Sequence, residues 1–82
     1  MENYPYLSES IANVLEIIRK ERGMSKTALA DFAGTRRSYI LEIVKGQKKP
    51  TVNIIFHLCK ALHISPVDFF RRVEEEMEKR KK

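Results

Sequence analysis

The segment from Ser25 to Gly46, SKTALADFAGTRRSYILEIVKG, constrains the fold more than any other part of the chain. Its pattern indicates a short helix with Ser25 as its N-cap, a tight turn at Gly34 and a second helix that becomes apolar at Ile40 and Ile43. A small residue such as Ala30 lets two helices cross closely, and glycine adopts the positive φ of tight turns. This spacing is typical of a helix-turn-helix unit over residues 25–46.

Helical periodicity predicts three further helices and no strand, so the expected fold is all-α with five helices. The first helix is expected to begin near Ser8, with Ser8 as its N-cap, and to end at Gly23. The fourth follows Thr51 and is apolar around most of its girth, which predicts a central position. The fifth begins at Ser65 and Pro66, because proline suits the first position of a helix. The expected core comprises Ile11, Val14, Leu15, Ile18, Leu29, Ala30, Phe32, Ala33, Ile40, Ile43, Val52, Ile55, Leu58, Cys59, Leu62 and Phe69, with Ile54, Phe56 and Ala61 widening the apolar face of the fourth helix.

The composition sets limits on the class of protein. A chain of 82 residues has room for one domain, and its net charge of +5 favours a polyanionic partner, although many small basic domains reach that value with solvated lysines. A single cysteine, Cys59, excludes an internal disulfide framework and fits a reducing compartment. No apolar run is long enough to span a bilayer and no signal peptide is recognisable, so we expect a cytoplasmic protein without a membrane partner.

The start of the third helix carries the residue types that read DNA. With its isoleucines turned inward, Arg37, Ser38 and Glu42 point outward and Arg36 lies at the N-terminal edge. Arginine binds guanine O6 and N7 in bidentate fashion, serine bonds to several base edges, and glutamate accepts from cytosine N4. Arg37 is the strongest candidate base reader. The alternative is that both arginines are solvated surface charges and that Glu42 pairs with Lys45.

Phosphate contacts are expected at helix ends and in the basic loop after Gly46. Lysines in such a loop are also found simply solvated, and that alternative stays open for Lys48 and Lys49. The candidate phosphate ligands are Lys26, Tyr39, Gln47, Lys48, Lys49 and Thr51.

Several short patterns carry a joint signal: Ile18-Arg19 to Gly23-Met24-Ser25, Leu29-Ala30, Gly34, Ser38-Tyr39-Ile40, Gly46 with the basic loop to Pro50, and Ala61-Leu62 followed by Ser65 and Phe69-Phe70. Through them the chain resembles the Cro/cI-type (XRE) family of bacterial and phage helix-turn-helix regulators over nearly all of residues 11–70. The resemblance implies a lambda-repressor-like domain over residues 1–82 that binds double-stranded DNA as a homodimer and regulates transcription. Phage repressors, restriction-modification controllers and antitoxins are among the small members of this family.

The fifth helix and tail, residues 65–82, are where controller-like members of that family pair. By this analogy Phe70, Val73 and Met77 are candidates for a homodimer interface. The alternative is that these three residues close the core of the monomer, and the two roles are compatible.

The chain departs from the family pattern at three places. Lys26 stands where members usually have glutamine. Lysine keeps the phosphate contact of that glutamine but lacks the amide that braces a base-reading side chain. Arg36 stands where a serine or threonine cap is common, so Thr35 becomes the best local cap of the third helix, which is expected to end near Val44. Val44 replaces a glutamate that pairs, in the family, with the arginine matching Arg19, and Arg19 must therefore find another partner or stay solvated.

Catalysis finds no support in the sequence, and no cofactor or metal site is expected. Two histidines and one cysteine are too few ligands for a zinc site. A second hypothesis is a protein-interaction module on the same fold, such as an antitoxin. Ile54 and Phe56 of the fourth helix, with the apolar stripe of the fifth, would then contact the partner protein.

Overall fold

The computed structural model describes residues 2–81 and contains five α-helices, which confirms the predicted all-α fold. Met1 and Lys82, the ends of the predicted domain, lie outside the described residues. Over residues 2–81 no strand is present. The helices are α1 (Leu7–Glu21), α2 (Lys26–Ala33), α3 (Arg37–Val44), α4 (Val52–Ala61) and α5 (Pro66–Arg80).

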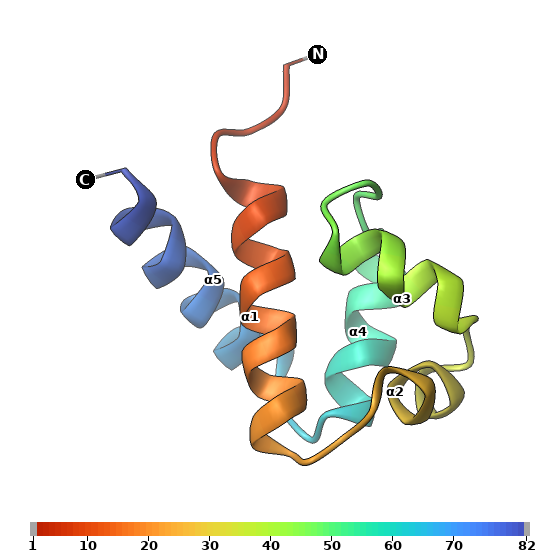
Figure 1. Cartoon of the computed structure of the whole chain (residues 1–82). Coiled ribbons are helices and arrows are strands. Elements are labelled where there is room, and N and C mark those ends of the chain that lie inside the picture. The colour runs from red at the N-terminus through yellow and green to blue at the C-terminus, as the bar shows by residue number, and fades with distance from the viewer. Residues whose placement is uncertain (1, 82) are drawn as a thin grey trace.

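Helix α1 lies between α5 on one side and the pair α3 and α4 on the other, while α2 lies at the end of the bundle below α3 (Figure 1). Helix α1 packs against α5 and α3, and α2 packs against α3 and α4. The centre of the core consists of side chains that are at most 2% exposed: Leu15, Ile18, Leu29, Ala30, Ile40, Ile43, Leu58, Cys59, Leu62, Phe69 and Val73. Burial raises the pKa of the Cys59 thiol to about 11.

Three of the helices begin at the hydroxyl caps that their sequences predict. Ser25, Thr51 and Ser65 each accept a hydrogen bond from the backbone N–H three residues later, at 3.0, 3.2 and 3.1 Å. Helix α1 differs, and the predicted cap at Ser8 is wrong. Its N-cap is Tyr6, at a φ of 64°, which makes no side-chain cap bond.

Three residues that periodicity assigns to the core lie on the surface. Phe32 of α2 is 72% exposed, and Val52 and Phe56 of α4 are 66% and 54% exposed. Helix α4 packs against α2 and, less extensively, α5. Because Val52 and Phe56 are exposed, the predicted burial of α4 around most of its girth is wrong.

The start of α3 lacks a side-chain cap. Thr35 does not cap it, because the N-cap position falls on Arg36, which has extended φ and ψ of −91° and 148° and no side-chain cap bond. A serine fits this backbone, so Arg36→Ser should raise the free energy of unfolding by about 1 kcal/mol, measured by urea denaturation. Arg37→Ser removes the same charge inside the helix and should give no gain. Equal stability changes in the two variants would contradict this account.

Candidate nucleic-acid interface

The turn between α2 and α3 has the geometry that the sequence predicts. Gly34 is the C-cap of α2 at a φ of 73°, a left-handed conformation that glycine adopts without strain. The N–H of Thr35 donates to the carbonyl of Ala30 at 2.9 Å, which closes the last turn of α2. Ile40 and Ile43 are 0% and 1% exposed and anchor α3 on the core. These contacts turn the opposite side of α3 toward solvent.

The outer side of α3 presents the predicted base readers. Arg36, Arg37 and Ser38 are exposed and Glu42 is half-buried. An open hollow of about 280 Å³ at this surface is lined by Thr35, Arg36, Ser38, Tyr39, Glu42 and Lys48. Three predicted base readers thus lie beside two predicted phosphate ligands, with Arg37 exposed on the same turn of helix. The structure does not bring Lys26 into this group.

Positive charge is concentrated on this unit. Residues 26–49 contain six lysines and arginines but only Asp31 and Glu42 as acids, so they account for four of the five net positive charges. Over the described part of the chain, Arg36, Arg37 and Lys48 form no ion pair. The alternative pairing of Glu42 with Lys45 is likewise absent from residues 2–81. These guanidinium and ammonium groups are therefore available to a partner.

The loop after α3 is folded back on the helix. The N–H groups of Gln47 and Lys48 donate to the carbonyl of Glu42 at 2.8 and 3.2 Å. The Lys49 ammonium donates to the side chain of Asn3, and the Thr51 hydroxyl is occupied as the cap of α4. Within residues 2–81 the Lys48 side chain has no hydrogen-bond or ion-pair partner, whereas the Lys49 ammonium is bonded to Asn3.

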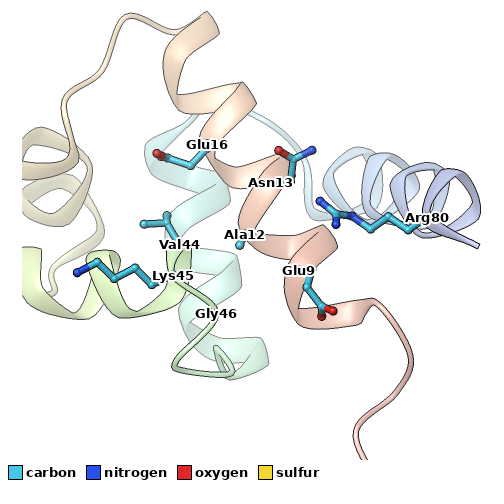
Figure 2. Close-up of a pocket in the computed structure, with 8 residues that line it drawn as sticks. All are labelled: Glu9, Ala12, Asn13, Glu16, Val44, Lys45, Gly46 and Arg80. Carbon is cyan, nitrogen blue, oxygen red and sulfur yellow. The ribbon is translucent and has the colours of Figure 1, made fainter.

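Lys26, at the start of α2, belongs to a second polar group that includes Glu16 of α1. Its Nζ lies 3.6 Å from Glu16 Oε1. Arg19 donates to both carboxylate oxygens, from Nε to Oε2 at 2.6 Å and from Nη2 to Oε1 at 3.2 Å, and from Nη1 to the Met24 carbonyl at 2.6 Å. Of the two alternatives left open for Arg19, the structure shows the first, another partner. In Figure 2, Glu16 projects toward the end of α3, where Val44 lines the same hollow of about 340 Å³.

The charge state of Glu16 follows from this arrangement. Partial burial opposes ionisation, but the Arg19 hydrogen bonds and the nearby charges of Arg19, Lys26 and Lys20 outweigh it and lower the pKa below the ordinary value of 4.5. Because the pKa is lower in the folded chain, the pair stabilises the fold above about pH 4.5, and this contribution is lost as the pH falls through the lowered pKa.

The three residues proposed for a dimer interface are not equivalent. Val73 is 2% exposed, lies one turn beyond Phe69 and packs inside the chain, as the alternative of a core role predicts. Met77 is half-buried against the core. Phe70 is 37% exposed, and its ring packs edge-to-face on Phe69 at a centroid distance of 5.6 Å. Val67, 70% exposed and one turn before Phe70, extends this apolar surface and was not predicted, although its i, i+3 spacing to Phe70 signals it.

Residues 2–81 contain neither a metal-binding cluster nor a membrane-spanning helix. No group of three histidine, cysteine, aspartate or glutamate side chains is placed to hold a metal ion. None of the helices formed by these residues has the length and apolar character needed to cross a membrane.

Five helices with a tight turn between α2 and α3 and a basic, outward-facing start of α3 define a helix-turn-helix protein. Residues 15–69 match the Helix-turn-helix family HTH_3, and the chain belongs to this XRE-type family of transcriptional regulators. It is 26% identical over 58 residues to the HTH-type transcriptional regulator y4dJ of Sinorhizobium fredii, covering 71% of this chain and 75% of that protein.

Solved structures share the whole fold. The restriction-modification controller protein C.Esp1396I, as a tetramer on its natural 35 base-pair operator, superposes with a TM-score of 0.83 at 29% identity, covering 93% of this chain and 97% of that one. The clp gene regulator ClgR of Corynebacterium glutamicum superposes with a TM-score of 0.88 over 96% of this chain and 84% of that one. Its identity is 23%, so this second likeness shows the fold alone.

Proposed function

We propose that the chain is a transcriptional regulator that binds specific sequences of double-stranded DNA as a homodimer, with α3 in the major groove. The observation that carries this proposal is the hollow at the start of α3, where exposed basic and hydroxyl side chains without ion-pair partners in residues 2–81 lie together. The operator complex of C.Esp1396I, a protein of similar fold and length, supports it. The proposal places DNA binding in a single domain over residues 1–82.

Each surface residue has an assigned role. Arg37 reads guanine, because its guanidinium is exposed, lacks an ion-pair partner over residues 2–81 and lies on the first turn of α3. Arg36, Ser38 and Glu42 read neighbouring positions. The phosphate ligands are Lys26, Tyr39, Gln47, Lys48, Lys49 and Thr51. This role requires no catalytic residue, cofactor or metal, and the chain is accordingly proposed to be a non-enzyme that acts in the cytoplasm, which its lone cysteine also fits.

Selection from a random duplex library at near-physiological salt tests the proposal. Enrichment of a two-fold symmetric motif with half-sites about one helical turn apart is the expected result. Failure of the folded protein to enrich any motif would overturn sequence-specific binding.

Homodimer formation through α5 is tested by Phe70→Ala. Truncation of a half-exposed aromatic at the centre of an interface removes about 2 kcal/mol of binding free energy, so the dissociation constant of the dimer should rise about 30-fold by sedimentation equilibrium. Phe32→Ala, which removes an exposed ring from α2, is the matched control and should leave the constant unchanged. An unaltered dimer in the Phe70 variant would place the interface elsewhere.

A second candidate function is protein binding, and the most exposed aromatic of residues 2–81 favours it. Phe32 lines an open hollow of about 270 Å³ between α2 and α4, together with Met24, His57, Lys60, Ala61 and His63. The lining contains no carboxylate, so it suits an apolar side chain flanked by acidic groups. A folded chain that enriches no DNA motif, yet loses binding to such a partner in Phe32→Ser, would favour this function over the first.

A further inference from the structure

Glu16 lies close to two cationic side chains. Arg19 holds the α1–α2 connection, and Lys26 is proposed to bind a DNA phosphate. Arg19 donates hydrogen bonds to both carboxylate oxygens of Glu16. It also donates to the Met24 carbonyl, which fixes the chain two residues before the start of α2. The ammonium of Lys26, the first residue of α2, lies 3.6 Å from Oε1 of the same carboxylate. The side chains of Glu16, Arg19 and Lys26 are 22%, 12% and 30% exposed, so the group is only partly screened by water.

We propose that Glu16 is a positioning residue for DNA binding, which orients the Lys26 ammonium toward a phosphate. The proposal rests on the proposed function. An ammonium has three donors, so an ion pair with one carboxylate leaves donors for phosphate oxygens. Lysine has a long and flexible stem, and holding it before the partner arrives lowers the entropy cost of the contact.

Because Glu16 is negatively charged, this proposal and simple electrostatics predict opposite changes in DNA affinity when the charge is removed. A carboxylate near a phosphate backbone repels it, so simple electrostatics predicts that Glu16→Gln binds DNA more tightly. Orientation of Lys26 predicts the opposite. Glutamine keeps the shape of the side chain and can still accept a hydrogen bond from Arg19, so the substitution removes the charge that holds Lys26 with little change in packing.

The experiment measures the affinity of four proteins and one control for a duplex selected from the random library, over a range of salt concentrations. They are the wild type, Glu16→Gln, Lys26→Met and the double variant, with Glu9→Gln as a control that removes an exposed carboxylate from the same helix. Glu16→Gln should bind about twofold to fivefold more weakly than the wild type, the range of a partly exposed ion pair. Lys26→Met should lower the slope of log K against log salt by about 0.9, and adding Glu16→Gln to it should cause no further loss.

The outcomes separate the inference from the function on which it rests. A Glu16→Gln variant that binds as tightly as the wild type or Glu9→Gln would overturn the inference while leaving DNA binding intact. So would a loss that persists in the Lys26→Met background, because Glu16 would then act through Arg19 and the α1–α2 connection. A wild type that binds no duplex would overturn the proposed function, and the inference with it. Thermal unfolding of each variant verifies that the fold is retained.

Discussion

Phe69→Ala should lower the free energy of unfolding by about 3–5 kcal/mol, the usual cost of truncating a buried phenylalanine. The ring is 1% exposed and is among the largest fully buried side chains of the core. Domains of this size are stabilised by only about 5–15 kcal/mol, so the variant should be largely unfolded at a temperature that the wild type tolerates. Urea denaturation followed by far-ultraviolet circular dichroism measures the change.

The matched control for Phe69 is Phe32→Ala, which removes the same ring from a site that is 72% exposed. Surface substitutions of this kind change stability by less than about 0.5 kcal/mol. Similar losses in the two variants would mean that α5 is not docked on α1 as the structure describes.

Arg37→Ala should abolish discrimination at one base pair of each half-site, at a cost of about 1–3 kcal/mol of binding free energy to the selected duplex. The reason is that a bidentate contact stabilises binding to guanine, whereas opposite another base the two N–H donors of the guanidinium lack their acceptors. Fluorescence anisotropy with a series of singly substituted duplexes would locate the position. If the variant bound selected and random duplexes in the same ratio as the wild type, Arg37 would not be a base reader.

The effect of Lys48→Ala on DNA binding is the comparison for that of Arg37→Ala. Loss of a phosphate contact weakens binding to every sequence alike and lowers the salt slope by about 0.9, without changing the ratio between duplexes. The two variants therefore distinguish sequence reading from backbone attraction on the same surface.

The sequence was sufficient to predict the helix-turn-helix because its signals are local. The cap at Ser25, the left-handed Gly34 and the inward Ile40 and Ile43 each follow from the residue itself and its near neighbours. Burial on the flanks was less predictable, since an apolar position such as Phe56 or Val52 is buried only if another helix covers it. Periodicity gives the face of a helix but not which neighbours it meets.

The candidate site was predictable to the extent that it lies on one helix. The outward positions of α3 follow from its inward ones, and the hollow beside Ser38 and Glu42 gathers most of them. Glu16 was missed, although it precedes Arg19 by three residues, because that spacing is common on solvated helix faces. Its approach to Lys26 depends on the path of the α1–α2 connection, which no local pattern specifies.

The burial of Cys59 has a practical consequence for following this molecule in solution. Its thiol is enclosed in the core, where alkylating dyes cannot reach it. With a pKa of about 11 it is also almost entirely protonated at neutral pH, so little reactive thiolate is present. A cysteine introduced at an exposed position such as Lys45 would then be the one reactive thiol of the native chain. A fluorophore attached there would report on the end of α3 without any need to replace the core residue.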